Sequence, residues 1–155
     1  MYGVWYHCHT NNRDDPDLQV MLTDFGLART LEDKHQLLDV KTTVRRRKWC
    51  NPLGTVGYMA PEIISAREYG PAADVFSSGV LLYILLVGRP PFNARTELQT
   101  LKNTTKGNYS MHPEDWEDVS ASAVDLVRRM LLVNPKERIT VDQVLAHPWL
   151  VENTD

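Results

Sequence analysis

Gly54-Thr55-Val56-Gly57-Tyr58-Met59-Ala60-Pro61-Glu62 is the most informative stretch of this sequence, because its last three residues close a long irregular segment and lead into helical sequence. The segment opens at Asp24-Phe25-Gly26. Directly before it, apolar residues alternate over 18–23, which predicts a short strand. An irregular stretch this long inside a compact domain is usually functional or disordered. We therefore look for function between Asp24 and Glu62.

From Ala60 onward the local signals are helical. Pro61 suits the opening of a short helix, and Pro71 suits the first position of a longer one. The longer helix is expected to reach about Val87 and to stop at the Gly-Arg-Pro-Pro run of 88–91. Three further helices are predicted: a polar amphipathic one over 94–106, one capped by Ser120 and ended by Asn134-Pro135, and a last one opened by the capping box of Thr140 and Gln143.

Length and composition limit the class of protein. The chain has 155 residues, 43% of them hydrophobic, which fits one globular domain. Its net charge of -3, with both signs mixed, argues against nucleic acid as a partner. Val80 to Val87 is the longest apolar run and is too short to cross a membrane. Two cysteines suggest no disulfide framework, and we expect a cytoplasmic or nuclear location.

The two tripeptides together resemble the ends of the activation segment of a protein kinase, where Asp-Phe-Gly opens it and Ala-Pro-Glu closes it. Further blocks match serine/threonine kinases in the same order: 74–79 (Asp-Val-Phe-Ser-Ser-Gly), 90–92 (Pro-Pro-Phe), 134–139 (Asn-Pro-Lys-Glu-Arg-Ile) and 147–150 (His-Pro-Trp-Leu). Residues 116–150 look most like the calcium/calmodulin-dependent group. The resemblance implies a mainly α fold, an incomplete kinase C-lobe with a small β element before the activation segment.

The same resemblance divides the chain into three parts. Residues 1–13 have no match, residues 14–150 form a partial protein kinase domain, and residues 151–155 are a tail. Asp24 resembles the carboxylate that holds Mg²⁺ against the phosphates of ATP. Phe25 would pack beneath it, and Gly26 would let the backbone turn. A turn at the end of a strand, without any metal, is the alternative reading of this tripeptide.

Three threonines between Asp24 and Glu62 are candidate site residues, Thr55 by the same resemblance and the other two by their surroundings. Thr55 occupies the position where serine/threonine kinases carry a threonine that touches the catalytic base. Thr42 and Thr43 lie near a basic run, Arg45-Arg46-Arg47-Lys48, and are candidate phosphorylation sites, because added charge could order the loop against arginines. An ordinary exposed polar loop remains an equal alternative for these two. The basic run itself fits a solvated face or a phosphothreonine partner better than a nuclear-import patch.

Structural roles are implied for three charged residues. Glu62 and Arg138 correspond to an ion pair that ties the activation segment to the start of the last helix. Asp74 corresponds to the carboxylate that caps the backbone of the catalytic loop. That loop is not evident here, because Asp14 of Asn12-Arg13-Asp14 lies only ten residues before Asp24 and no asparagine follows it over 15–23.

The sequence lacks the other parts that phosphoryl transfer needs. It contains no Gly-x-Gly-x-x-Gly loop, no phosphate lysine in a Val-Ala-x-Lys strand and no catalytic base, so we assign no catalytic residue. We expect a kinase fragment that is inactive as this chain and binds neither Mg²⁺ nor ATP by itself. A non-catalytic module that binds peptides or a partner protein is the alternative. The partners expected are protein or peptide substrates or a partner protein, with no nucleic acid and no membrane; a metal site at His7-Cys8-His9 is not favoured.

Overall fold

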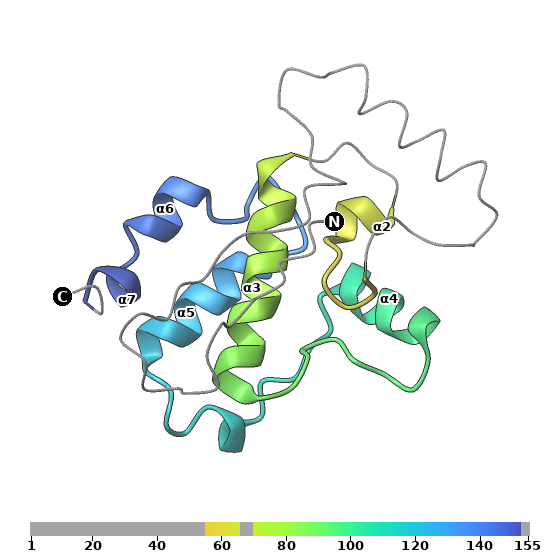
Figure 1. The fold of residues 1–155 in the computed structure, drawn as a ribbon, viewed down its shortest axis with the longest axis horizontal. Helices are drawn as coiled ribbons and strands as arrows, with labels where there is room; N and C mark the ends of the chain where they lie inside the picture. Colours follow the sequence, from red (N-terminus) through yellow and green to blue (C-terminus); the bar gives the residue numbers. More distant parts are fainter. Residues whose placement is uncertain (1–54, 66–69, 153–155) are drawn as a thin grey trace, which may run out of the picture.

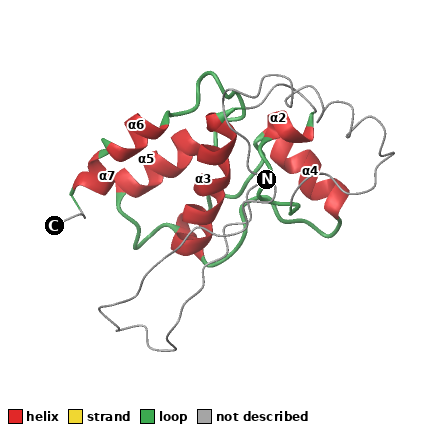
Figure 2. Ribbon diagram, turned by 45° about the horizontal axis from the view of Figure 1, so that its top comes forward, coloured by secondary structure: helices red, strands yellow, loops and turns green. Residues whose placement is uncertain are grey.

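A 17-residue helix, α3 (Pro71–Val87), runs through the middle of the body that the computed structural model describes (Figure 1). The described residues are 55–65 and 70–152. The strand expected over 18–23 and the tripeptide Asp24-Phe25-Gly26 lie outside them. Within the described residues all regular elements are helical, as Figure 2 shows, and the predicted mainly α fold is confirmed.

Six more elements surround α3. Two helices, α5 and α6, and the short α7 lie on one side of it, and α2 and α4 lie on the other (Figure 1). The elements are α2 (Pro61–Ile64), α4 (Glu97–Lys106), the 3₁₀ turn η2 (Pro113–Asp115), α5 (Ala121–Met130), α6 (Val141–Leu145) and α7 (Pro148–Val151). None of the helices in the described part is long and apolar enough to span a membrane.

Side chains at the N-termini set where the helices begin. Thr96 accepts a hydrogen bond from the Gln99 N–H at the start of α4. Ser120 does the same for Ala123 in α5, which confirms the cap predicted there. At α6, Thr140 and Gln143 form the expected reciprocal capping box. Each cap satisfies backbone donors that the first turn leaves unpaired.

Three helix bounds differ from the sequence prediction. The helix expected from residue 94 begins at Glu97, because the Ala94 N–H is bonded to the side chains of Asn93 and Thr100 instead of entering the helix. The helix expected to reach Asn134 ends at Met130. The predicted last helix is two pieces, α6 and α7, because a residue before proline avoids the helical region and His147, which precedes Pro148, is extended.

The crossing of α3 and α5 is close. A Cβ added to Gly79 of α3 would lie 2.7 Å from the Met130 Cβ. Only glycine therefore fits at this point of the crossing without movement of one helix. The core beside the crossing is aromatic, with Phe76 stacked on Phe92 at 5.7 Å and Tyr83 packed edge-on against Trp116 at 5.2 Å between ring centroids. Phe76 and Tyr83 of α3 thus pack into one buried cluster with Phe92 and Trp116.

Candidate functional site

Glu62 and Arg138 form a buried ion pair across 76 positions of sequence. Arg138 Nη1 donates to Glu62 Oε1 at 2.8 Å, and Arg138 Nη2 donates to Oε2 at 3.0 Å. The side chains are 0% and 2% exposed for Arg138 and Glu62. The parallel two-bond geometry is the strongest form of this contact, because a planar guanidinium matches both carboxylate oxygens.

The remaining donors of Arg138 bind backbone carbonyls. Nη1 also donates to Ala72 O at 2.6 Å, which lies at the start of α3. Nε donates to Leu132 O at 2.8 Å and Nη2 to Val133 O at 3.3 Å. All five N–H groups of the guanidinium are thus used. One side chain joins the end of the long irregular segment, the start of α3 and the loop after α5.

Local sequence places both members of the pair. Pro61 begins α2, so Glu62 falls in its first turn, where a carboxylate is favoured by the helix dipole. Arg138 precedes α6, and its guanidinium carbon lies 4.9 Å from the centroid of the Phe76 ring. The ring covers the pair from the core side and adds a cation–π contact. Because every N–H group of the guanidinium is bonded and both side chains are buried, the pair holds three segments together.

A second contact fixes the segment just before Glu62. Ser77 Oγ of α3 lies 2.8 Å from Tyr58 O and 3.2 Å from Ala73 O, so its hydroxyl can donate to the backbone of the segment. The Tyr58 N–H donates to Thr55 O at 3.2 Å, which closes a turn. Gly57 in that turn has φ +101°, a conformation that favours glycine. Thr55 is exposed at the start of the described segment.

Asp74 lies in the first turn of α3, where the residue is exposed. Neighbouring protein atoms partly desolvate its carboxyl and raise its pKa from 3.8 to about 6. No hydrogen bond or ion pair holds this carboxylate among the described residues. Among the described residues, no hydrogen bond or ion pair joins Asp74 to the Glu62–Arg138 pair.

Several expected site residues cannot be placed. Asp24, Phe25 and Gly26, together with Thr42 and Thr43, lie outside the described residues. The parts that are described contain no group of three His, Cys, Asp or Glu side chains able to hold a metal ion. The structure thus brings together Glu62 and Arg138 but gives no geometry for a nucleotide or metal site.

Two features were missed at the level of sequence. Ser77 had no assigned role, although it lies in a block that matched the family. His147 links α5 to α7: its Nε2 lies 3.2 Å from Asp125 Oδ2, and its Nδ1 accepts from the Trp149 N–H. The hydrogen bond from His147 lowers the pKa of Asp125, with Arg129 acting in the same direction. Proline after His147 was the only local signal of a helix start here.

A known protein family matches most of this chain. The family described as "Protein kinase domain" matches residues 10–150. The chain belongs to the protein kinase domain family. Its match covers both Glu62 and Arg138, and the predicted resemblance to a partial kinase C-lobe is confirmed.

The chain is similar to relatives that are named calcium-dependent or calcium/calmodulin-dependent protein kinases. It is 40% identical over 139 residues to calcium-dependent protein kinase 26 of Oryza sativa, covering 90% of this chain and 23% of that protein. It is 34% identical over 160 residues to the calcium/calmodulin-dependent protein kinase type II alpha chain of Drosophila melanogaster, covering 94% and 28%. The chain thus spans about a quarter of the length of these curated relatives.

A solved structure agrees with the fold. The twitchin kinase region from C. elegans superposes with a TM-score of 0.60 at 34% sequence identity, covering 64% of this chain and 19% of that one. The likeness supports a partial kinase C-lobe.

Proposed function

We propose that this chain is part of a serine/threonine protein kinase whose complete form transfers the γ-phosphate of ATP to protein hydroxyls, and that these 155 residues alone are inactive. The observation that carries the proposal is the buried Glu62–Arg138 pair, because it anchors the end of the activation segment to the helical body. Membership of the protein kinase domain family supports the reaction class.

The described residues supply a platform for the activation segment. Arg138 holds α2 against the start of α3, and Ser77 lies within hydrogen-bonding distance of the Tyr58 carbonyl. Together they hold the stretch that begins at Thr55, which in our proposal faces the Ser or Thr hydroxyl of a protein substrate. The proposed role of this half of the domain is to position substrate, which is the main contribution a protein makes to phosphoryl transfer.

The nucleotide side of the reaction rests on residues outside the described part. We assign the Mg²⁺ ligand to Asp24, with Phe25 and Gly26 setting its position, as in the family pattern. In the complete kinase, ATP would supply the transferred phosphoryl group, and Mg²⁺ would neutralise the charge that develops on it. Thr42 and Thr43 are proposed as sites where phosphorylation orders the segment. We place the complete protein in the cytoplasm or the nucleus.

Inactivity of the chain follows from the missing catalytic parts. The 155 residues contain no glycine-rich phosphate loop and no recognisable catalytic base. Loss of single groups of this kind costs orders of magnitude in rate, so loss of the set leaves nothing to align ATP with a hydroxyl.

The test is direct. We expect the purified chain to show no thermal shift with Mg·ATP and no transfer of labelled phosphate to myelin basic protein. The Asp24→Ala variant is the control for any signal. Transfer that disappears in Asp24→Ala would overturn the claim of inactivity.

Transcript mapping tests the claim that the chain is part of a larger kinase. Coding sequence for a glycine-rich loop and a His-Arg-Asp triplet upstream of Met1 supports this claim, and stop codons in all frames contradict it.

A further inference from the structure

His147 lies between α6 and α7 and is only 6% exposed. Its two ring nitrogens have different partners. Nδ1 accepts a hydrogen bond from the Trp149 N–H at 3.3 Å and so caps α7, and Nε2 lies 3.2 Å from Asp125 Oδ2 of α5. Because an ionised carboxylate can only accept, the ring proton belongs on Nε2 and the lone pair on Nδ1. The geometry therefore specifies the neutral ring in one particular tautomer.

A second proton on this ring would remove the cap of α7. It would come from water and bind the lone pair of Nδ1, and a doubly protonated imidazole has no acceptor left. Turning the ring over would not restore the cap, because both nitrogens would then donate. The Trp149 N–H would face another N–H in a site that is nearly closed to water. The charged ring is thus incompatible with the capped form of α7.

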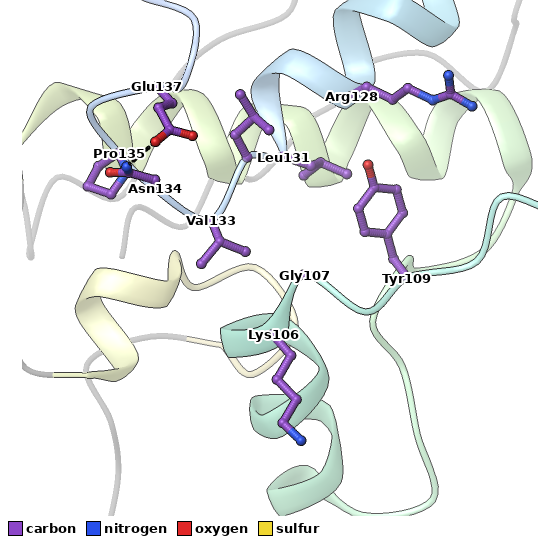
Figure 3. A pocket seen from close by; sticks show the side chains of 10 residues that line it. Lys106, Gly107, Tyr109, Arg128, Leu131, Val133, Asn134, Pro135 and Glu137 are labelled. Carbon is purple, nitrogen blue, oxygen red and sulfur yellow. Dashed lines mark hydrogen bonds between the residues drawn. The ribbon is translucent and has the colours of Figure 1, made fainter.

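The charges of α5 do not offset this loss. The Asp125 side chain is 48% exposed, and its Oδ2 also receives Arg129 Nε at 2.8 Å. Water and Arg129 therefore weaken the attraction between this carboxylate and a charged His147 ring. The third charged residue of α5, Arg128, lines an open hollow beside Tyr109 at the end of α4 instead (Figure 3).

The other elements around His147 bring no counter-charge. The charged residues concerned are Asp142 in α6, Asp74 in α3 and Glu152 at the end of α7. In the part of the chain that the structure describes, none of them forms a hydrogen bond or an ion pair with His147. Arg138, which precedes α6, is committed to its ion pair with α2.

The short helix α7 covers apolar residues of the body. Trp149 and Leu150 are partly buried and pack against a buried cluster made of Val75, Leu126, Met130 and Ile139. The helix has only four residues, which is too short to persist without its cap and this packing. Loss of the cap would therefore free α7 and expose the cluster beneath it.

We propose that His147 is a pH-sensitive switch for the docking of α7: the neutral ring holds α7 on α5, and uptake of one proton at Nδ1 releases it. An ordinary histidine takes up a proton below about pH 6.5. The docked form excludes this proton and the released form accepts it, so docking is strongest above about pH 7 and weakens as the pH falls. The switch needs no phosphoryl transfer, so it goes beyond the proposed kinase function.

Nuclear magnetic resonance of the full 155-residue chain tests the switch. The amides of Leu150, Val151 and Glu152 bond to the carbonyls of residues 147 and 148, and their hydrogen exchange is measured at pH 7.5 and 5.5 with correction for the intrinsic pH dependence. We expect protection to fall at least about threefold at pH 5.5, toward a limit of about tenfold for a histidine that only the released form protonates. Unchanged or increased protection would overturn the proposal.

Matched variants assign the effect to His147. His147→Asn keeps a side-chain oxygen that can cap α7 but takes up no proton, so protection should be equal at both pH values. His112→Asn is the control and should respond as the parent does, because His112 is exposed and its side chain makes no cap hydrogen bond. Asp74, whose pKa is about 6, is present in all three proteins, so its effect cancels in the comparison. A pH response that persists in His147→Asn, or that disappears in His112→Asn, would refute the switch.

Discussion

Arg138 is the residue whose surroundings explain most about this part of the kinase domain. It bonds Glu62 from α2 and the carbonyl of Ala72 in α3, and it receives the face of Phe76. A buried ion pair adds little net stability even when all its hydrogen bonds are formed. Removal of one partner, however, leaves the other charge buried and without a counter-charge. The residue therefore acts mainly to specify how three segments meet.

Replacement of Arg138 should be far more damaging than replacement of a surface arginine. Arg138→Ala is expected to lower the free energy of unfolding by about 3–5 kcal/mol, because the Glu62 carboxylate would stay buried without its partner. Arg129→Ala removes an exposed pair with Asp125 and should cost at most about 1 kcal/mol. Urea unfolding followed by circular dichroism gives both values. If Arg138→Ala is too unstable to measure, Glu62→Gln serves as the milder variant, and a loss equal to that of Arg129→Ala contradicts the assignment.

Asp74 should make stability depend on pH in a recognisable way. Its folded pKa of about 6 lies above the ordinary 3.8, so the folded state holds the proton more tightly than the unfolded state. The contribution of Asp74 to stability is therefore present below about pH 4 and is lost as the pH rises through 6. Asp74→Asn, which mimics the neutral form, should match the parent at pH 4 and melt higher at pH 7.5. A melting difference that is the same at both pH values would contradict the raised pKa.

At the scale of elements, the close crossing of α3 and α5 is a sensitive contact. Gly79→Ala should destabilise the protein by about 1–3 kcal/mol, because its Cβ would lie 2.7 Å from that of Met130, although alanine is the better helix former. Ser78→Ala, one position earlier on the exposed side of α3, is the control and should be neutral or slightly stabilising. Thermal unfolding of both variants decides the matter, and a stabilised Gly79→Ala would mean that the helices can separate freely.

Element bounds show what local sequence can predict. The start of α3 at Pro71 and its end at Val87, capped by Gly88, follow from backbone preferences of single residues, and both were predictable. The start of α4 was not, because its position depends on Asn93 and Thr100 side chains that take the Ala94 N–H. The end of α5 was not either, since the carbonyls of Leu132 and Val133 bond to Arg138.

At the scale of the whole molecule, α3 carries more apolar surface than its neighbours cover. Leu85 is 70% exposed, the largest value among the exposed hydrophobic residues of the described part. Leu85→Lys should change the free energy of unfolding by no more than about 0.5 kcal/mol, because the side chain is already in water. It should reduce self-association in sedimentation velocity. Ser78→Lys, on the same helix, is the control, and equal association of parent and Leu85→Lys would show that this face is not adhesive.

The family, the helical class and the two members of the main ion pair were predictable from the sequence alone. These depend on ordered motifs, on proline and glycine punctuation and on capping residues, all of which act through chemistry that is local or shared across the family. How the described segments are held together became visible only in the fold, because the carbonyls that Arg138 binds and the contact of Ser77 with Tyr58 join separate segments of the chain. Such contacts depend on where the packed core places backbone atoms in space. The spacing of residues along the sequence does not give the distance between those atoms.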